Sequence, residues 1–318
     1  MKMSSNLTRH ALNGETMGTR YSAVFFAPDA ADLGAIGTAL FAAVDQVDQQ
    51  MSTWKPDSDL NRLNAAPLHQ WLDAPLALLT VLDAAVRVGM ESEGAFDIGV
   101  GGLVNAWGFG PTGQAPDAPQ IRALGEQAHC AASDALEIDL GPLRVRKKEN
   151  VTLDLSGIAK GYGVDALAQC LDGFGITRYL VGIDGEMRAK GCKPDGQAWA
   201  VAIEKPVRHV REVMGVMALV DAAIATSGDY RHWIEVGDKY LSHTMDARRG
   251  RPVDNRLACV TVILPTCMLA DAWATAFMVM GASAASKLAQ QRGMTALLVS
   301  RVGDAFEEIS ILDGKLQP

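Results

Sequence analysis

The stretch Leu153–Asp165, LDLSGIAKGYGVD, decides the fold, because in it a β-prone run passes directly into a helix. Ser156 stands where a helix takes its N-cap. The helix is expected to continue to about Leu171 and to end at Gly173, since glycine is the usual residue just after a helix. A strand, a tight turn and a helix in this order place the helix start at one end of a sheet.

The turn within this stretch has the features of an anion site. A helix N-terminus presents free N–H groups and the positive end of the helix dipole, which suits phosphate. Gly157 lets a ligand or a metal approach the backbone, and Lys160 can reach anionic oxygens. The glycine spacing matches neither a Walker A loop nor a dinucleotide fingerprint. An ordinary capped helix is the alternative interpretation.

Outward from this stretch, apolar spacing predicts further helices and strands. Helices are expected at Leu33–Met51, Pro75–Met90 and Met268–Met280. Strands are expected at Thr16–Phe26, in the runs ALEIDL and VTLDL between Ala135 and Leu155, and at Arg178–Val181, Trp199–Ile203, Val213–Val220, His232–Val236, Tyr240–Ser242, Ala258–Leu264, Ala296–Ser300 and Glu307–Leu312. Gly237-Asp238 reads as a hairpin turn, and Gly110–Ala128 as an irregular segment with one short helix. The pattern predicts an α+β fold with mixed sheets and packed helices in two interleaved halves.

Composition sets limits on function. The chain has 318 residues, of which 48% are hydrophobic, and a formal net charge of -8, which argues against wrapping nucleic acid. No window reaches the roughly 18 apolar residues of a membrane span, and the first residues do not read as a signal peptide. Five cysteines without a CxxC pair fit neither a disulfide framework nor a zinc site. The expected location is the cytoplasm, with reduced thiols.

A second segment with chemistry is the apolar run Leu269–Gly281, LADAWATAFMVMG. Asp271 and Thr275 are spaced i, i+4, so that their oxygens share one helix face. A buried carboxylate needs a partner, and a hard cation such as Mg²⁺ accepts carboxylate, hydroxyl and carbonyl oxygens. The alternative partners of Asp271 are an arginine or a helix end.

A third segment, Ala222–Asp254, contains the polar run Thr226–Asp229, read as a turn, and His243. Histidine beside a turn is a plausible general base, although a lone histidine is more often structural. The arginines of Asp246–Pro252 either neutralise phosphate or form an exposed turn.

Two further segments are suited to a flat ligand. Ala95–Gly110, AFDIGVGGLVNAWGFG, combines five glycines with three aromatic residues, which can close and stack on a ring system or pack on one another. Glu15–Thr19 and Met51–Trp54 can line the same pocket.

Taken in order, these segments resemble the ApbE family, the FAD:protein FMN transferases, from Gly14 to Gly281. The resemblance rests on TMGT, MSTW with SDLNRLN, AFDIGVGGLVNAWGFG, DLSGIAKGYGVD, ATSGDY, SHTMDARRGRPV and ADAWATA. It implies an ApbE-like fold with a catalytic domain over residues 14–285, completed by C-terminal strands in 286–318, and a cleft between the halves. The chain departs from the family pattern at Asp184-Gly185, where paired glycines are usual, and at Trp54, where tyrosine is more usual.

The resemblance also implies the roles of individual residues. Mg²⁺ would be held by the Gly157 carbonyl, the Asp271 carboxylate and the Thr275 hydroxyl. His243 is the implied base, and Lys160 supplies positive charge. The implied flavin contacts are Met17, Trp54, Ala95, Phe96, Asp97, Asp154, Lys160 and Met245, with Asp229 and Tyr230 as secondary candidates.

The implied reaction is transfer of FMN from FAD, the substrate, to a Thr or Ser hydroxyl of an acceptor flavoprotein, with release of AMP. Neither nucleic acid nor a membrane span is expected to take part. The alternatives are an FAD pyrophosphatase that uses water as acceptor, and a flavin-binding protein without turnover. A structural protein would have no affinity for flavin.

Overall fold

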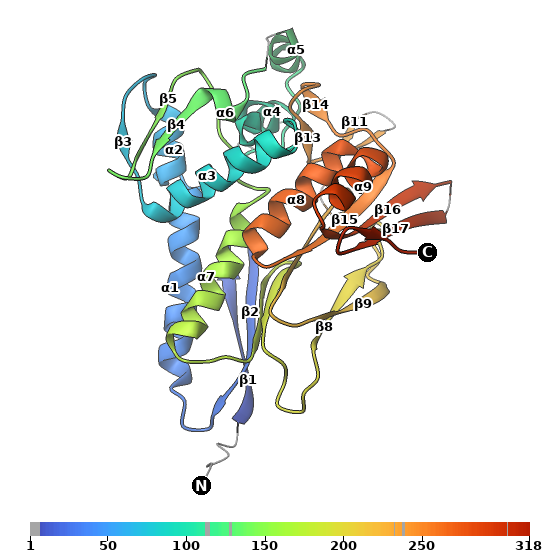
Figure 1. Ribbon diagram of the computed structural model, residues 1–318. Helices are drawn as coiled ribbons and strands as arrows, with labels where there is room; N and C mark the ends of the chain where they lie inside the picture. The colour runs from blue at the N-terminus through green and yellow to red at the C-terminus, as the bar shows by residue number, and fades with distance from the viewer. Residues whose placement is uncertain (1–6, 112–114, 127–128, 232, 237–238, 304) are drawn as a thin grey trace.

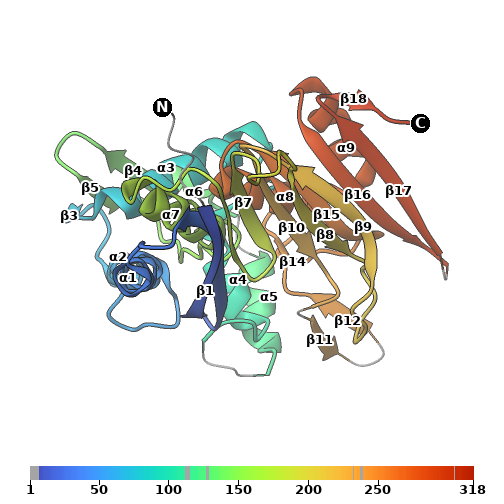
Figure 2. The same ribbon diagram turned by 90° about the horizontal axis from the view of Figure 1, so that it is seen from below.

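The computed structural model describes residues 7–111, 115–126, 129–231, 233–236, 239–303 and 305–318 (Figure 1). Within these ranges, nine antiparallel strands form the main sheet in the order β1-β2-β6-β7-β10-β15-β16-β17-β18. They are β1 (Leu7–Thr16), β2 (Thr19–Pro28), β6 (Tyr179–Ile183), β7 (Glu186–Lys190), β10 (Ala223–Gly228), β15 (Leu257–Leu264), β16 (Thr295–Val302), β17 (Ala305–Leu312) and β18 (Lys315–Leu316). The first and last strands of the chain therefore belong to the same sheet but lie at its opposite edges. Figure 2 shows the β16–β17 hairpin far from β1.

Alternating residues of the strands face two different layers. In β2, Ala23 and Phe25 join the core beneath the helices, whereas Val24 and Phe26 contact a small hairpin on the other face. This hairpin consists of β8 (Trp199–Glu204) and β9 (Val213–Leu219). Because successive side chains of a strand point to opposite faces, the sheet carries apolar residues on both sides.

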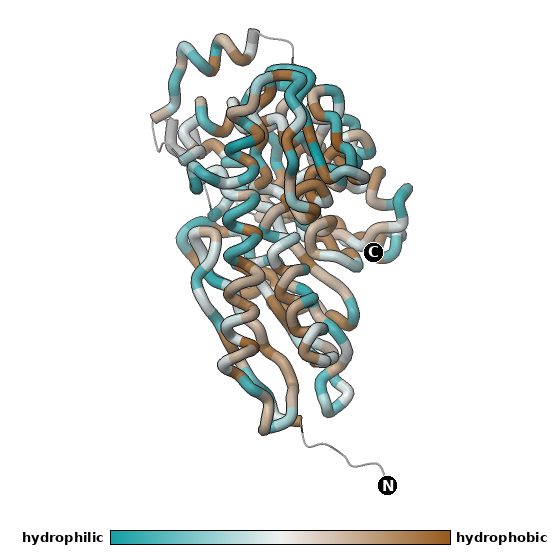
Figure 3. The backbone as a smooth tube through the Cα atoms, turned by 90° about the vertical axis from the view of Figure 1, so that its left-hand side faces the viewer, coloured by the Kyte–Doolittle hydropathy of each residue, from teal (hydrophilic) through white to brown (hydrophobic). Residues whose placement is uncertain are grey.

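All four helices that the sequence predicts, α1 (Leu33–Met51), α3 (Leu76–Glu91), α7 (Ala159–Gly173) and α8 (Cys267–Met280), are present, and most of them cover the other face of the sheet. α1, α7, α8 and α9 (Ala282–Gln291) lie against this side, and α3 packs on α8. α1 begins where the Asp32 side chain accepts a hydrogen bond from the Ala35 N–H. Hydrophobic and hydrophilic residues alternate along the helices (Figure 3), as expected when one side of each helix is buried.

A smaller group of elements lies at one end of the molecule, above α1 and α7 in Figure 1. Its helices are α2 (Asp59–Ala65), α4 (Gly101–Ala106), α5 (Ala118–Glu126) and α6 (Ala132–Ala135), with the 3-10 turn η1 (Ile98–Val100). Its sheet has the order β3-β5-β4, from β3 (Leu72–Asp73), β5 (Arg144–Lys147) and β4 (Leu136–Asp139). Two short pairs of strands lie elsewhere: β11 (Trp233–Val236) with β12 (Lys239–Ser242), and β13 (Met245–Asp246) with β14 (Arg251–Pro252).

Two local predictions are wrong. The run VTLDL is irregular, because its backbone bonds to Asn64, Ile98 and Gly101 instead of a neighbouring strand. The basic run 144–147 is the strand instead. Ser156 is not the N-cap: α7 begins at Ala159, while the Ser156 N–H donates to Asp154 in a local turn.

Two further differences concern strand ends. The predicted strand Thr16–Phe26 is mostly β2, and the chain reverses at Met17-Gly18, whose φ angles of 47° and 70° suit a two-residue hairpin turn. The polar run at Thr226 is not a turn, because β10 continues to Gly228. The predicted turn Gly237-Asp238 and His232 lie outside the described residues.

The α+β fold class is confirmed. Within the described part of the chain, none of the helices has the length and apolar character needed to cross a bilayer.

Candidate active site

A cleft of about 830 Å³ opens between the start of α7, the face of α8 and the segment Ala95–Phe109. This volume lies in the range of sites that enclose small molecules. The structure brings almost all the predicted site residues to its walls, namely Met17, Trp54, Ala95, Phe96, Asp97, Asp154, Gly157, Lys160, Tyr230, His243, Met245, Asp271 and Thr275. Segments distant in sequence therefore share one cavity.

Asp229 is the predicted site residue that does not line the cleft. Its carboxylate accepts hydrogen bonds from both terminal nitrogens of Arg301, at 2.8 and 2.5 Å. Arg208 lies 3.9 Å away. This pairing turns Asp229 toward β16, which is separated from β10 by β15 in the sheet.

Asp271 joins the two central helices. Its side chain is buried, and one carboxylate oxygen accepts a hydrogen bond from the Gly161 N–H at 3.0 Å, in the first turn of α7. The alternative partner that the sequence left open, a helix end, is thus present. Burial and the nearby Glu186 carboxylate raise the pKa of Asp271 well above its usual range, against the opposing effect of Lys160.

Thr275 lies beside two groups from other elements. Its hydroxyl is 3.1 Å from that of Ser227, near the end of β10. A Cβ at Gly157 would lie 3.1 Å from the Thr275 hydroxyl and 3.3 Å from the Phe96 ring. A side chain at position 157 would therefore require Thr275 or Phe96 to shift by a few tenths of an ångström. Gly157, Asp271 and Thr275 all line the cleft.

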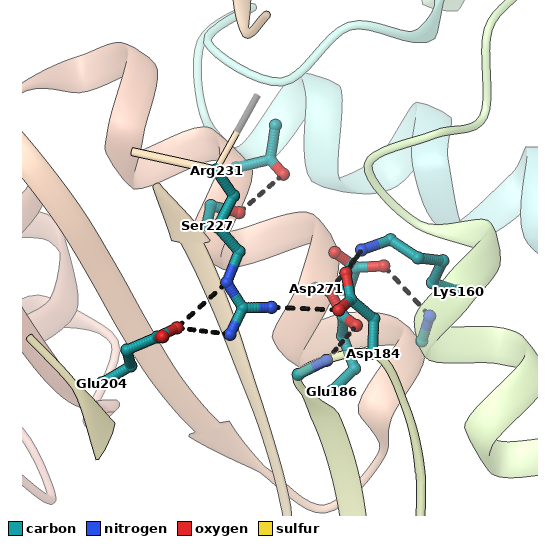
Figure 4. A network of polar contacts seen from close by, with 10 residues as sticks. Lys160, Asp184, Glu186, Glu204, Ser227, Arg231 and Asp271 are labelled. Atoms are coloured by element: carbon teal, nitrogen blue, oxygen red, sulfur yellow. Dashed lines mark hydrogen bonds and ion pairs between the residues drawn. The ribbon is translucent and has the colours of Figure 1, made fainter. Parts of the chain in front are cut away.

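Lys160 is held by acidic residues from the β6–β7 hairpin (Figure 4). Its ammonium donates to Glu186 at 2.7 Å and lies 3.7 Å from Asp184. Burial alone would lower the pKa of Lys160, but Glu186, Asp271 and Asp184 raise it above its usual range. Lys160 is therefore a fixed positive charge at the cleft.

Arg231 continues the network across the cleft. Its guanidinium donates to Asp184 at 3.0 Å and to Glu204 at 3.0 and 2.5 Å, as Figure 4 shows. The Tyr230 hydroxyl also donates to Glu204, at 3.5 Å, and burial raises the pKa of Tyr230 to about 12. Tyr230 is accordingly a neutral hydrogen-bonding group at physiological pH.

Asp154 and Asp97 stabilise the backbone around the cleft. The Asp154 carboxylate accepts from the Ser156 N–H at 2.8 Å. The carboxylate of Asp97 accepts from the N–H groups of Gly99 and Ala132, and its second oxygen lies 2.7 Å from a ring nitrogen of His129. Because these partners occupy both Asp97 oxygens, this residue shapes the wall of the cleft.

The remaining predicted residues lie at the opposite wall and the rim. The His243 ring meets Phe109 edge-on, with centroids 6.4 Å apart. Met245 is buried, whereas Trp54 is 63% exposed, so a bound ring system could cover its indole. The nearby arginine run is an exposed turn: Arg248 and Arg249 pair with Asp246, and none of its arginines lines the cleft.

Sequence reasoning missed five polar residues that build this site: Asn64, Asp184, Glu186, Glu204 and Arg231. The Asn64 side chain bonds both backbone groups of Leu153, at 2.7 and 3.0 Å, and so holds the segment that leads to Asp154. The only available signal was its position in the run SDLNRLN. Asp184 was noted only as a departure from the paired glycines of the family, and Glu186, Glu204 and Arg231 occur singly along the chain, without a distinctive pattern.

Comparisons with known proteins point to one family. The model of the ApbE family matches residues 17–298. The FAD:protein FMN transferase of Vibrio cholerae is 38% identical over 298 residues, with 93% of this chain and 89% of the relative covered. The protein of the same name from Escherichia coli K12 is 35% identical over 302 residues, with 93% and 85% covered.

Solved structures give the same result. The flavin transferase ApbE from Vibrio cholerae has a TM-score of 0.85 at 37% identity, covering 96% of this chain and 97% of the other. The apo flavinyl transferase ApbE of Pseudomonas stutzeri has a TM-score of 0.85 at 34% identity, covering 97% and 96%. The resemblance expected from the sequence motifs is confirmed.

Proposed function

Because the chain belongs to the ApbE family and is an enzyme of the flavin transferase class, we propose that it transfers the FMN half of FAD to a protein hydroxyl. The acceptor is a Thr or Ser side chain of a flavoprotein, and AMP is released. The observation that carries this proposal is the buried Asp271 carboxylate at the cleft, beside the Thr275 hydroxyl and Gly157.

The reaction is a substitution at phosphorus. The acceptor oxygen forms a bond to the FMN-side phosphorus of FAD, and the bond from that phosphorus to the bridging oxygen breaks. His243 lines the cleft and receives the hydroxyl proton on a ring nitrogen, which typically contributes about 10²- to 10⁴-fold to such reactions. Lys160 faces the diphosphate as a positive charge.

The residues at the α7–α8 contact fit a Mg²⁺ ion. One carboxylate oxygen of Asp271 accepts a hydrogen bond from the Gly161 N–H, and the residue lines the cleft. The Thr275 hydroxyl and the Gly157 carbonyl complete an oxygen donor set of the kind that Mg²⁺ prefers. The described residues hold no cluster of three Asp, Glu, His or Cys suited to a metal, so this mixed set is the candidate site. Bound there, Mg²⁺ would neutralise charge on the diphosphate.

The flavin ring is proposed to lie against the apolar part of the cleft. Trp54 is free to stack on one face of the ring, and Met17, Phe96 and Met245 supply apolar contacts. The adenosine half extends toward the rim, where it leaves as AMP. The volume of about 830 Å³ is large enough for a dinucleotide of this size.

The test uses Asp271→Asn, which keeps the shape of the side chain and removes its charge. We expect FMN transfer to an acceptor protein, measured by the mass gain of the acceptor and by AMP release, to fall by at least about 100-fold with Mg²⁺ present. Asp139→Asn removes a carboxylate that pairs with Arg144 away from the cleft and is the control. Transfer at the wild-type rate by Asp271→Asn would refute the metal assignment. AMP release that needs no acceptor would instead identify a pyrophosphatase.

A further inference from the structure

Asp184 holds both cations that face the diphosphate position. One of its carboxylate oxygens accepts from Arg231 at 3.0 Å, and the other lies 3.7 Å from the Lys160 ammonium. All three residues line the cleft, and Figure 4 shows the carboxylate between the two positive groups. Asp184 is therefore a bridge between Lys160 and Arg231.

The backbone at this position does not require an aspartate. Asp184 has a φ of 55°, in the left-handed region where glycine is most favoured and where Asn and Asp are tolerated. Its N–H donates to the Arg20 carbonyl, a bond that any residue except proline could make. In the described residues, the contacts of the carboxylate are the two ion pairs. The Asp184 side chain therefore contributes a negative charge to the cleft, whereas the turn itself does not need it.

This added charge opposes the binding of an anion. Six acidic and three basic side chains, besides two histidines, line the cleft. Lys160 is already compensated by Glu186 and Arg231 by Glu204. With Asp184 also present, three carboxylates offset the positive charge of Lys160 and Arg231, so these cations attract an incoming diphosphate less strongly. Charges a few ångströms apart interact strongly at a partly buried site.

We propose that Asp184 is a specificity-determining residue that makes the enzyme discriminate against FAD without a divalent cation. This inference rests on the proposed function, because it assumes that FAD is the bound anion. The diphosphate of metal-free FAD is dianionic and is repelled by the surplus carboxylate. A diphosphate neutralised by one Mg²⁺ carries little net charge, so Asp184 affects its binding much less.

The consequence is a coupling between two ligands. If the Asp184 carboxylate weakens the binding of FAD alone more than the binding of FAD with Mg²⁺, then Mg²⁺ strengthens FAD binding by a larger factor when the carboxylate is present. Removing the charge must reduce this factor. A purely structural role of Asp184 would change both FAD affinities in parallel.

The experiment measures the Kd of FAD by quenching of flavin fluorescence, once in EDTA and once with saturating Mg²⁺, without acceptor. AMP is monitored to show that FAD stays intact. For Asp184→Asn we expect the Kd in EDTA to fall about tenfold. With Mg²⁺ we expect a change of less than about twofold, because the bound diphosphate is neutralised. Asp184→Gly, which also suits the φ of 55°, should behave in the same way, whereas the control Asp139→Asn should match the wild type.

Two results would overturn the inference: an unchanged Kd in both conditions, or equal shifts in both conditions. The second would mean that Asp184 only shapes the cleft. If the wild-type enzyme itself does not bind FAD, the proposed function fails before the role of Asp184 is reached. The two failures are thus distinguishable.

Discussion

Glu186 is the residue on which the position of Lys160 depends. Its side chain is 4% exposed, accepts from the Lys160 ammonium at 2.7 Å, and is part of β7, which the sequence did not predict. We therefore classify it as a positioning residue. Glu186→Gln should lower kcat of FMN transfer by about tenfold while KM for FAD changes less, because the cation remains but is no longer fixed.

Glu137→Gln is the matched control for this change. Glu137 pairs with Arg146 on the small sheet, outside the cleft, and its loss should leave kcat unchanged. Glu186→Asp keeps the charge and should recover part of the rate. Equal losses in Gln and Asp variants would contradict a positioning role, since a structural defect alone would then explain both.

The candidate site could be predicted only where its residues follow a local pattern. Asp271 and Thr275 are visible in the sequence because they interrupt an apolar helix at a spacing of four. Asp184 and Arg231 have no such signal. They meet because β7 and β10 are neighbours in the sheet, and this pairing joins residues far apart in the chain.

At the scale of elements, the irregular segment 151–155 depends on one side chain. Asn64 satisfies the N–H and the carbonyl of Leu153, at 2.7 and 3.0 Å, where a strand partner is lacking. Asn64→Ala leaves two buried backbone groups unpaired and should reduce the free energy of unfolding by about 2 to 4 kcal/mol. Because this segment leads to Asp154, FAD affinity should weaken as well.

Urea unfolding and FAD titration measure the two effects. Asn13→Ala removes an amide that bonds Arg20 at the exposed end of the β1–β2 hairpin, and it should cost less than about 1 kcal/mol. An Asn64→Ala protein as stable as the wild type would show that water or the relaxed backbone satisfies Leu153.

Element prediction succeeded where the signal is local. α1 and α8 follow from apolar residues at helical spacing, and the structure places them at nearly the predicted bounds. β1 was missed because its sequence, LTRHALNGET, is largely polar, as befits a strand at the edge of a sheet. VTLDL has strand propensity but no strand beside it, since side chains and loops take up its hydrogen bonds.

At the scale of the whole molecule, the order of the strands is the feature that the sequence could not supply. β2 ends at Pro28 and pairs with β6, which begins at Tyr179, although several helices and a separate small sheet lie between them in the chain. The family resemblance implied an ApbE-like fold with mixed sheets and packed helices in two interleaved halves, but it gave no strand order. The cleft exists because this crossover brings the β1–β2 turn next to α7, where Met17 approaches Gly163.

Buried thiols make global stability depend on pH in the alkaline range. Cys259 in β15 is fully buried, and burial, helped by Asp229, raises the pKa of its thiol to about 12. In the unfolded chain a cysteine ionises near about 8.5. The folded protein therefore keeps a proton that the unfolded protein loses. The stability due to this thiol is complete below about pH 8.5 and is lost as the pH rises toward about 12, by up to about 1.4 kcal/mol per pH unit.

Urea unfolding of the wild type and of Cys259→Ala, from about pH 8 to about pH 11, tests this linkage. The variant should be less stable at pH 8, because it loses buried contacts, but its stability should decline less steeply as the pH rises. Cys192→Ala, at a half-buried position, serves as the control for general alkaline effects. If the curves of wild type and Cys259→Ala stay parallel, the thiol ionises in the folded state as readily as in the unfolded chain. Alkylation of the native protein provides an independent check, since Cys259 should react only at the rate of global unfolding.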